Sequence, residues 1–392
     1  MKVVQISSTC GSGSIGKICQ SVSELLTSEG IENYVLYTIG HSNYQQSINY
    51  GKPKDTKKYA LLSRVIGNYG FNATFSTNRL IEELDCISPD IVHIHNIHSH
   101  DCNFETLFAY LKDKKIKIYY TFHDCWAFTG YCMYFDAVNC NKWKTTCHNC
   151  PQRKKFSWFF DRSKELQQRK KKSLTDLDLT IITPSEWLAN LTKESFLSSY
   201  PIRVINNGID LNVFSPTQSD FRKKINCEAK FVILGIASKW EKRKGLDTFI
   251  KLASDLSDQF QIVLVGTTDN IDKKLPQNII SIHRTEGQKE LASIYTAADI
   301  LVNPTMEENF PTVNIEAIAC GTPVFTYDTG GSAEMLNERC SVVIPRGDYR
   351  QLLSEIQKYS SSQRFSSDDC IAQAAHYAQA LKFSEYIDLY KK

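Results

Sequence analysis

Residues 3–29 decide the fold, and they read VVQISSTCGSGSIGKICQSVSELLTSE. The apolar run at 3–6 is typical of a buried parallel strand, and a helical pattern follows at 18–29. Between them lies a glycine-rich turn, Gly11 to Gly16, whose backbone amides at the start of a helix can hold a phosphate or a sugar. The stretch therefore predicts the strand, loop and helix of an α/β layer.

The same alternation of short apolar runs and helical patterns continues along the chain. It predicts further strands at residues 34–38, 91–94, 116–122, 203–205, 231–236, 261–265, 279–282, 300–302 and 324–327. Helices are predicted between them at residues 79–84, 246–256, 290–298 and 313–319. This order indicates parallel α/β layers in both halves. The boundary between the two predicted domains falls near residues 206–210, where two Asn and a Gly tolerate a left-handed backbone.

Length and charge limit the classes of protein to which the chain can belong. At about 150 residues per domain, 392 residues are enough for two or three domains with a large core. The 46 Lys and Arg and 43 Asp and Glu leave a net charge of +3, too small for a general nucleic-acid binder. No run reaches the roughly 18 apolar residues of a membrane span, and the chain turns polar at Ser7, too soon for a signal peptide. We therefore expect a cytoplasmic protein, in which the 13 cysteines are free or bind a metal.

Residues 153–172 depart from this neutral average. Nine Lys and Arg stand against Asp161 and Glu165, a local charge of +7. The interleaved aromatic residues are Phe156, Trp158, Phe159 and Phe160. The segment is either a solvated helix with one buried side or a surface for an anionic acceptor or the inner face of the cell membrane. Nucleic acid is not expected, because no known groove-reading module accompanies the segment.

The spacing from Gly11 to Lys17 is that of a P-loop. A Walker A loop, however, needs Ser or Thr after the lysine to ligate magnesium, and here Ile18 follows it. A nucleotide hydrolase is therefore the weaker alternative for this loop. A tight turn that packs helix on strand is the structural alternative, and it is compatible with contact to a substrate.

Histidines gather at the ends of two predicted strands. His93 and His95 fall on one face, because strand side chains alternate with a period of two, and His98 follows them. No carboxylate or thiol in this stretch completes a tetrahedral set, so hydrogen bonding is favoured over a metal site. His123 and Asp124 follow the strand at 116–122, at the carboxyl edge where open α/β sheets bind their ligands.

A cysteine array, C-x7-C-x6-C-x2-C, is formed by Cys132, Cys140, Cys147 and Cys150, with His148 inside the last pair. Four soft ligands in such a short stretch can close a tetrahedral zinc site and stiffen a loop that has few apolar anchors. Free thiols or a redox pair are the main alternative, and an iron–sulfur cluster is a lesser one.

Two glutamates flank a predicted helix start in the C-terminal half. Pro311 suits the first position of that helix, so Glu308 lies just before it and Glu316 about one turn inside it. The free amides at a helix N-terminus attract a diphosphate, while carboxylates there accept hydrogen bonds from sugar hydroxyls. Lys239 and the run at 242–244 supply cations for a leaving diphosphate. Taken alone, each motif also fits an ordinary acidic cap or a solvated turn.

Together these motifs resemble the family 4 retaining glycosyltransferases, particularly the bacterial exopolysaccharide and colanic-acid type. The resemblance spans nearly the whole chain and rests on residues 11–16, 89–96, 123–124, 183–188, 207–210 and 243–247, the pair Glu308 and Glu316, and 329–331. It implies the GT-B fold, in which two Rossmann-like domains face a cleft and the C-terminal helix crosses back to the first domain.

The resemblance also implies a domain plan. Residues 1–205 would form the acceptor-binding domain, with a cysteine-rich loop at 125–152 and the basic segment at 153–172. Residues 206–372 would bind the nucleotide-sugar, and a helix at 373–392 would pack back on the N-terminal domain.

The activity implied is transfer of a sugar from a UDP- or GDP-sugar to a hydroxyl of a glycan or a lipid-diphosphate-linked acceptor, with retention at the anomeric carbon. No divalent metal is required in this scheme, and zinc would be structural. A non-catalytic scaffold that binds a membrane or a partner protein is the alternative for the whole chain. Side-chain identity alone does not specify the donor sugar, the base or the acceptor.

Residue roles follow from the family by position. The catalytic residues would be His123, Glu308 and Lys244. The donor would be bound by Gly16, Lys239, Lys244, Arg284, Glu308, Asn309, Phe310, Pro311, Thr312 and Glu316. The acceptor would be bound by Gly11, Ser12, Gly13 and His98. Lys239 departs from the family, since many members carry Arg there or next to it, and a single-point cation does not replace a guanidinium fork.

Overall fold

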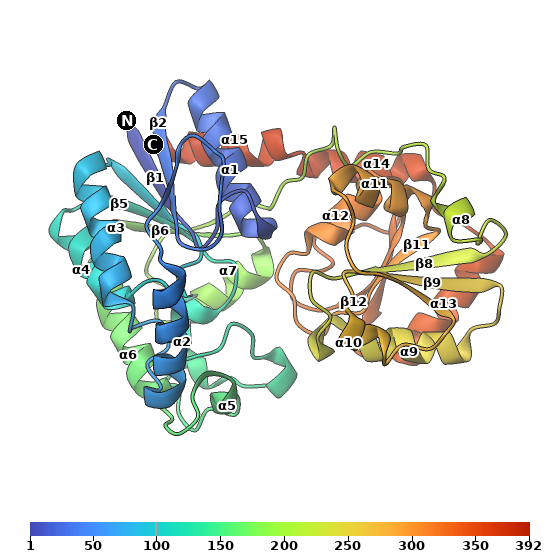
Figure 1. Ribbon diagram of the computed structural model, residues 1–392, viewed down its shortest axis with the longest axis horizontal. Coiled ribbons are helices and arrows are strands. Elements are labelled where there is room, and N and C mark those ends of the chain that lie inside the picture. The colour runs from blue at the N-terminus through green and yellow to red at the C-terminus, as the bar shows by residue number, and fades with distance from the viewer. Residues whose placement is uncertain (99) are drawn as a thin grey trace. The chain divides into compact units, whose positions relative to one another are not determined.

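The computed structural model describes residues 1–98 and 100–392 and divides them into two compact units. Unit 1 comprises Met1–Asn206 and Phe383–Lys392, and unit 2 comprises Asn207–Lys382. In each unit, helices pack around a central parallel sheet (Figure 1). The chain therefore forms the α/β layers expected from its alternating strands and helices.

In the described part of unit 1, the sheet has seven parallel strands in the order β3-β2-β1-β4-β5-β6-β7. The strands are β1 Lys2–Ile6, β2 Glu32–Tyr37, β3 Ser47–Asn49, β4 Ile91–Ile94, β5 Lys117–Thr121, β6 Leu179–Thr183 and β7 Ile202–Val204. β1 and β4 lie side by side, with Gln5 opposite His93. The strand order reverses at this pair, and open α/β sheets bind ligands beyond the carboxyl ends of their strands at such a point.

The helices of unit 1 are positioned by apolar stripes and by side-chain caps. They are α1 Gly13–Ser28, α2 Pro53–Ile66, α3 Thr74–Ile87, α4 Phe104–Asp113, α5 Arg153–Phe156, α6 Ser163–Ser173 and α7 Glu186–Lys193. α1 buries Ile18, Val22 and Leu26 at four-residue spacing, and this stripe holds the helix on the sheet. At the start of α4, the Asn103 side chain accepts a hydrogen bond from the N–H of Thr106.

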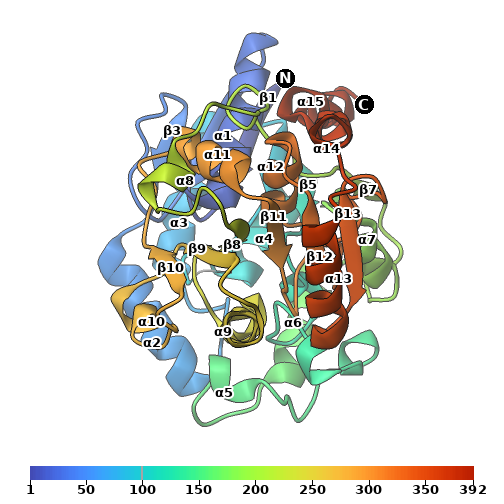
Figure 2. The same ribbon diagram turned by 90° about the vertical axis from the view of Figure 1, so that its right-hand side faces the viewer.

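Unit 2, described throughout, has a sheet of six parallel strands in the order β10-β9-β8-β11-β12-β13. The strands are β8 Phe231–Ile236, β9 Phe260–Val265, β10 Ile279–Ile282, β11 Ile300–Asn303, β12 Val324–Asp328 and β13 Ser341–Pro345. The helices are α8 Phe221–Lys224, α9 Leu246–Asp255, α10 Asp269–Asp272, α11 Gln288–Ala297, α12 Thr312–Ala319, α13 Tyr349–Ser361 and α14 Ser367–Ala374. Figure 2 shows α13, in red, lying along β13. The strand order reverses where β8 meets β11, so the loops after these two strands form the expected ligand edge.

The C-terminal helix α15, Gln379–Tyr390, contributes to the core of unit 1. Phe383 and Tyr386 are buried in one apolar cluster with Val3 of β1. Burial of two aromatic side chains against the sheet is enough to fix the end of this helix on unit 1.

The change from unit 2 to unit 1 falls between Lys382 and Phe383, whereas the sequence analysis placed it at residue 373. After α14 the chain makes a short 3-10 turn whose Tyr377 is buried in the core of unit 2, with its ring centroid 5.9 Å from that of Phe310. Ala378 then forms an isolated β-bridge with a residue at the start of unit 2. These contacts keep the chain in unit 2 beyond the expected boundary.

The basic segment at 153–172 lies in two different environments. Helix α6 packs against α4 and buries Leu166 and Lys170, so one of the basic side chains of the segment lies inside unit 1 and not on its surface. Before α6, the three aromatic residues 158–160 are exposed. Among the described residues, no helix is both long and apolar enough to cross a membrane.

Candidate active site

The loop after β11 carries Glu308 to the start of α12. Pro311 is the N-cap residue of this helix, where its missing N–H removes no helical hydrogen bond. Glu316 lies about one turn inside the helix, as the sequence predicted. The free amides of the first turn therefore lie between the two carboxylates along the chain.

Lys244 and Glu308 form an ion pair that joins two loops at the edge of the sheet. The Lys244 ammonium donates a hydrogen bond to Oε2 of Glu308, and the N–H of Asn309 donates to Oε1 at 3.2 Å. The Lys244 and Glu308 side chains are 21% and 11% exposed, so water screens their attraction only weakly. The pair places a cation and a carboxylate beside the N-terminus of α12.

Gly245 determines how Lys244 is presented. The chain makes a 3-10 turn at Lys242–Lys244, and Gly245 follows with a left-handed φ of 76°. A Cβ atom at this position would lie 2.4 Å from the carbonyl oxygen of Pro304. Glycine therefore allows the turn after β8 to approach the loop after β11 closely enough for the ion pair to form.

A second glycine fixes the loop that carries Glu308. Gly330 has a left-handed φ of 57°, and a Cβ atom there would lie 1.7 Å from the carbonyl oxygen of Glu308. The N–H of the next residue, Gly331, donates a hydrogen bond to the carbonyl oxygen of Asn309 at 2.9 Å. The turn after β12 thus packs against the backbone of the Glu308 loop, and a side chain at Gly330 would displace that loop.

Tyr295 on α11 orients the carboxylate of Glu316. Its hydroxyl donates a hydrogen bond to Oε2 of Glu316 at 2.9 Å. Burial, and then the nearby charge of Glu316, raise the pKa of Tyr295 well above its ordinary value, so the hydroxyl keeps its proton. The sequence analysis did not identify Tyr295. It lies within the predicted helix at 290–298, but no motif there marks it as a partner of Glu316.

Further contacts tie the start of α12 to its neighbours. The Asn303 amide donates to Oδ1 of Asn314 at 2.9 Å, and the Asn314 amide donates to the carbonyl oxygen of Ser332 at 2.9 Å. Nη1 of Arg243 donates to the carbonyl oxygen of Glu307 at 3.3 Å. These contacts join residues that are far apart in the sequence, so no local motif marks them.

Other residues expected at the donor site lie in varied surroundings. The Lys239 side chain is 79% exposed and pairs with Glu241 at 2.6 Å, so the structure does not bring it into the Lys244–Glu308 pair. Arg284 is exposed and follows β10. Asn309 and Phe310 are buried, and the Phe310 ring belongs to the apolar core, which leaves mainly their backbone available to a ligand.

Beside Arg284 lies a charged cluster that the sequence analysis did not identify. Nε2 of His283 lies 2.5 Å from Oδ2 of Asp272 and 3.7 Å from Oδ1 of Asp269. The hydrogen bond to Asp272 raises the pKa of His283. In the part of the chain that the structure describes, the potential ligand atoms of these three residues lie within 4.8 Å of one another. The side chains are largely exposed and already paired, which is typical of a surface ion pair.

The glycine loop of unit 1 closes on itself before α1. The N–H of Gly11 donates to the carbonyl oxygen of Gly16 at 2.9 Å, Ser12 is the N-cap residue, and Gly13 begins the helix. Ile18 is buried in the core, so its position offers no hydroxyl to a magnesium ion. The loop is therefore built as a tight turn and lacks a key feature of a nucleotide-hydrolysing P-loop.

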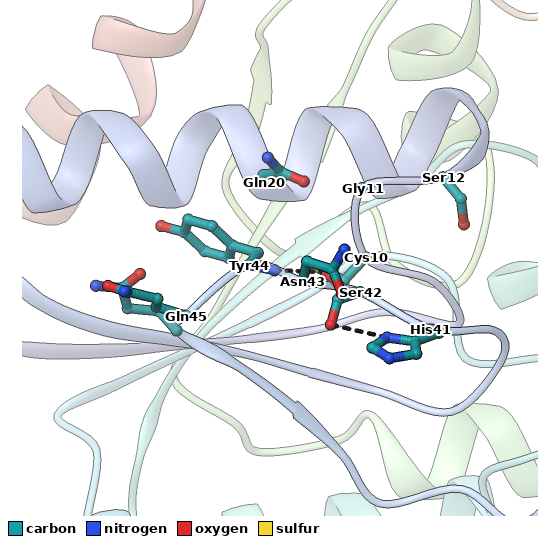
Figure 3. A pocket seen from close by; sticks show the side chains of 10 residues that line it. Cys10, Gly11, Ser12, Gln20, His41, Ser42, Asn43, Tyr44 and Gln45 are labelled. Carbon is teal, nitrogen blue, oxygen red and sulfur yellow. Dashed lines mark hydrogen bonds between the residues drawn. The ribbon is translucent and has the colours of Figure 1, made fainter.

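Beside this loop lies a pocket of about 480 Å³ (Figure 3). It is lined by Gly11 and Ser12 from the loop, by Gln20 from α1, and by residues 41–46. Most of the lining side chains are amides, hydroxyls and an imidazole, which can exchange hydrogen bonds with the hydroxyls of a glycan. Residues 41–46 contain no motif, and the sequence analysis did not identify them.

The histidines at the ends of β4 and β5 form a hydrogen-bonded chain. Oε1 of Gln5 accepts a hydrogen bond from Nε2 of His95 at 3.1 Å, so Nδ1 of His95 accepts the proton of His123 Nε2 at 3.2 Å. His93 Nε2 lies 2.7 Å from the Thr121 hydroxyl. Burial lowers the pKa of His123 to about 4 and that of His93 to about 3. Near pH 7 these imidazoles are therefore neutral hydrogen-bonding groups, as favoured from the sequence.

His98 is hydrogen-bonded to Asp124, the residue directly before the cysteine-rich loop. Its Nε2 lies 2.9 Å from Oδ2 of Asp124, and its Nδ1 lies 3.2 Å from the hydroxyl of Tyr69. Burial alone would raise the pKa of Asp124, but the charge of His98 and its hydrogen bond hold that pKa below the ordinary value. Both ring nitrogens of His98 thus have partners within unit 1, which favours a positioning role over direct contact with an acceptor.

The four cysteines expected to bind a metal line one small cavity together with Trp143: Cys132, Cys140, Cys147 and Cys150. The sulfur atoms of Cys132 and Cys150 are 3.9 Å apart. All 13 cysteines of the chain lie within the described residues, and each is a free thiol. The structure thus brings the array together at one place in unit 1.

Two family models match the chain, one after the other. Residues 16–213 match the model described as Glycosyltransferase Family 4, and residues 217–377 match Glycosyl transferases group 1. The chain is 21% identical to the putative colanic acid biosynthesis glycosyl transferase WcaC of Escherichia coli, over 100% of both chains. It is also 25% identical to a D-inositol 3-phosphate glycosyltransferase of Streptosporangium roseum, over 48% of this chain and 49% of that protein.

Solved structures share the fold. Sucrose-phosphate synthase from Thermosynechococcus elongatus matches with a TM-score of 0.74 at 18% identity, over 100% of this chain and 98% of that chain. Anabaena HepE in complex with UDP matches with a TM-score of 0.70 at 14% identity, over 100% of both chains. The two parallel α/β units are therefore those of the GT-B fold. The chain belongs to glycosyltransferase family 4 and is a glycosyltransferase.

Proposed function

We propose that this enzyme moves a hexosyl group from a UDP- or GDP-sugar to a hydroxyl of a glycan or a lipid-diphosphate-linked acceptor, with retention at the anomeric carbon. The Lys244–Glu308 pair in front of α12 is the observation that carries the proposal. It places a cation, a carboxylate and a helix N-terminus at the carboxyl edge of a parallel sheet, where such folds bind nucleotides.

Two of the relatives support this donor and this pathway. HepE has been solved in complex with UDP and in complex with UDP-glucose, which supports a nucleotide-sugar donor for the present enzyme. The likeness to WcaC, a putative colanic acid biosynthesis glycosyl transferase, extends over the whole chain and supports a role in bacterial surface polysaccharide synthesis.

The charged side chains of the proposed donor site in unit 2 have different tasks. Lys244 neutralises the diphosphate, and the first-turn amides of α12 add the positive end of the helix dipole. Glu316, oriented by Tyr295, accepts hydrogen bonds from the ribose hydroxyls, and Glu308 accepts them from the sugar. Before the donor binds, Lys244 and Glu308 satisfy each other, so neither partly buried charge is left unpaired. Exposed Arg284 is assigned to the nucleobase.

Unit 1 is assigned to the acceptor and to the reacting end of the donor. The polar pocket beside Gly11 and Ser12 supplies hydrogen-bonding groups for a glycan acceptor. The backbone at Gly16 is assigned to a phosphate oxygen. His123 is assigned to the sugar near the reacting carbon, and as a neutral imidazole it contributes a hydrogen bond and no charge.

In the proposed step, the acceptor oxygen forms a bond to the anomeric carbon while the bond from that carbon to the diphosphate oxygen breaks on the same face. The hydroxyl proton passes to the departing phosphate oxygen. In this step Glu308 orients the sugar and Glu316 the ribose through hydrogen bonds, and neither carboxylate acts as a nucleophile. Lys244 and the helix amides stabilise the departing diphosphate, so the proposed step needs no divalent cation.

Melting temperatures with UDP, GDP, ADP and magnesium-ATP, each with and without EDTA, test the proposal, because a ligand of the folded state stabilises it. We expect a shift with UDP or GDP that survives EDTA. The anomeric proton of a product made with sugars of that base then reports retention by NMR. A shift confined to magnesium-ATP would favour a nucleotide hydrolase, and no shift with any nucleotide would favour a non-catalytic scaffold.

We also propose that unit 1 docks on an anionic membrane surface, which would bring the enzyme to a lipid-linked acceptor. Trp158, Phe159 and Phe160 are 48%, 64% and 52% exposed. The N–H of Trp158 donates to the carbonyl oxygen of Arg64 at 2.7 Å, so this aromatic segment lies against α2, where Leu61 is 56% exposed. The neighbouring exposed cations are Lys57, Lys58, Arg64, Lys154 and Lys155. Exposed aromatic side chains among cations are typical of a surface that binds anionic lipid.

A further inference from the structure

The cysteine loop, residues 125–152, is long and has little regular structure. Its elements are short 3-10 turns at Trp126–Phe128, Asp136–Val138 and Lys142–Lys144. The loop nevertheless carries Trp143, whose side chain is 2% exposed, between two of the array cysteines. The first part of the loop is also anchored by Trp126, Phe128 and Phe135 in the core of unit 1. None of residues 144–151 is buried, so the part that carries Cys147 and Cys150 lacks such an anchor, and a metal ion would supply one.

The separation of one pair of sulfur atoms, those of Cys132 and Cys150, fits a shared metal ion better than a disulfide. Sγ of Cys132 and Sγ of Cys150 are 3.9 Å apart. A disulfide requires about 2.05 Å, whereas two thiolates on a tetrahedral zinc ion, each about 2.3 Å from it, are roughly 3.8 Å apart. Cys140 and Cys147 line the same small cavity. Among the described residues no three of the four sulfur atoms lie within 4.8 Å of one another, so a bound ion would have to draw these two side chains inward.

The backbone around the last two cysteines is fixed by hydrogen bonds from outside the pair. The N–H of Gly130 donates to Sγ of Cys147 at 3.3 Å, a contact that stabilises a thiolate. The N–H of Cys147 donates to Oε1 of Gln167 and that of Cys150 to Oδ2 of Asp161, each at 2.6 Å. Such supporting contacts orient the ligands of metal sites before the metal binds.

The Cys147–Cys150 turn is held from its other side as well. Nζ of Lys142 donates to the carbonyl oxygens of His148 at 3.1 Å and Asn149 at 3.2 Å. Asn149 adopts a left-handed φ of 44°, which tightens the turn between the two cysteines. A C-x2-C turn of this kind directs two sulfur atoms at one ion.

A buried lysine anchors the start of the cysteine loop from α6. Lys170 is fully buried, and its ammonium donates to the carbonyl oxygens of Trp126 at 2.6 Å and Thr129 at 3.1 Å. It also lies 3.4 Å from the centroid of the Trp126 ring. Lys170 lies on α6, so these hydrogen bonds tie the start of the cysteine loop to that helix.

We propose that Cys132, Cys140, Cys147 and Cys150 bind one structural zinc ion that fixes the cysteine loop. With four protein ligands the site is closed, so the ion stabilises the fold and takes no part in glycosyl transfer. The loop begins directly after Asp124, whose Oδ1 accepts the N–H of Trp126 at 2.8 Å. The ion thereby holds in place the segment that follows His123.

Metal analysis of the full chain, purified in a reducing buffer without chelator, tests this inference. We expect about one zinc per chain by mass spectrometry, and a zinc X-ray absorption spectrum that fits four sulfur atoms at about 2.3 Å. Cys140→Ser and Cys147→Ser are expected to lose most of the zinc. Cys86→Ser, at an exposed thiol of α3, and His148→Ala are expected to retain it.

Several results would exclude a zinc site at the four cysteines, and one of them comes from the wild-type protein alone. Wild-type protein without bound metal, in which an alkylating reagent modifies all four thiols at the rate of exposed Cys86, would exclude the site. A Cys132–Cys150 disulfide in protein purified without reductant, or iron with inorganic sulfide in place of zinc, would also exclude it. Loss of zinc in His148→Ala would show that His148 is one of the ligands, and this would contradict a site of four cysteines.

Discussion

Lys244 and Glu308 are hydrogen-bonded to each other although 64 residues separate them in the chain. Lys244 lies in the turn after β8 and Glu308 in the loop after β11, and these strands are neighbours at the point where the strand order reverses. Such a reversal separates the loops of an open α/β sheet and creates its ligand-binding edge. The ion pair therefore lies where the fold itself provides room for the donor.

Tyr295→Phe is expected to weaken donor binding with little change in kcat, because the hydroxyl orients Glu316 toward the ribose and does not touch the reacting atoms. Loss of one hydrogen bond to a charged group predicts a rise in the donor KM of about tenfold. Tyr377→Phe is the matched control, since its hydroxyl donates to a main-chain carbonyl oxygen at 3.2 Å. Steady-state kinetics with varied donor checks the prediction, and an unchanged KM in Tyr295→Phe would refute the role of this residue.

Gly330→Ala is expected to reduce activity and stability together, because its Cβ atom would lie 1.7 Å from the carbonyl oxygen of Glu308. Gly347→Ala is the matched control: Gly347 also has a left-handed φ, 79°, but the nearest atom to its Cβ is 3.6 Å away. The control bears only the conformational cost of about 1 kcal/mol. Thermal melts and activity assays should show a clearly larger loss at Gly330, and equal losses would contradict the loop geometry.

The buried histidines predict that stability falls in acid. The pKa of His123 is lowered to about 4 and that of His93 to about 3, against about 6.5 in the unfolded chain. The unfolded state therefore binds more protons below about pH 6.5, so this stability is complete above that pH and is lost as the pH falls toward 4. Urea unfolding between about pH 7 and pH 5 measures it.

A variant separates this effect from general acid denaturation. His93→Gln is expected to lose less stability over the same pH interval, whatever its stability at neutral pH, because one buried imidazole no longer titrates. His41→Gln, at an exposed histidine, is the control and should behave as the wild type. Equal pH dependence in all three proteins would show that His93 is not the group responsible.

Phe159→Glu is expected to release unit 1 from vesicles that contain phosphatidylglycerol, because Phe159 is 64% exposed among cations. Co-sedimentation should show a loss of bound protein of about tenfold. Leu381→Glu, at a leucine that is 51% exposed on α15, should bind as the wild type does. Equal binding of wild type and Phe159→Glu, or binding to neutral vesicles alone, would argue against an anionic membrane surface.

The sequence predicted most strands because each is a short buried apolar run. β1, β8, β9 and β11 all lie where such runs occur. It missed two edge strands, β3, whose three residues are partly exposed, and β13, in which Val343 is 41% exposed. Edge strands of this kind lack the continuous apolar pattern, since neighbouring strands do not cover them on both sides. It also missed β6, a largely buried strand between β5 and β7.

The site was predictable only as far as local pattern reaches. The position of Glu308 before α12 and Glu316 inside it follows from Pro311, which marks the helix start. The partners of these carboxylates, Lys244 and Tyr295, are set by which strands and helices become neighbours, and no spacing in the sequence encodes that. For the same reason, the sequence could not show that Lys170 is buried.

A calorimetric titration of UDP and GDP in EDTA, into the wild type and Lys244→Ala, tests the central claim most directly. We predict that one of the two nucleotides binds the wild type and that Lys244→Ala weakens its Kd at least about tenfold, because a diphosphate loses its cation. Lys239→Ala, which removes an exposed cation paired with Glu241, should bind as the wild type does. Equal affinity in the wild type and Lys244→Ala, or binding that appears only with magnesium, would contradict the account.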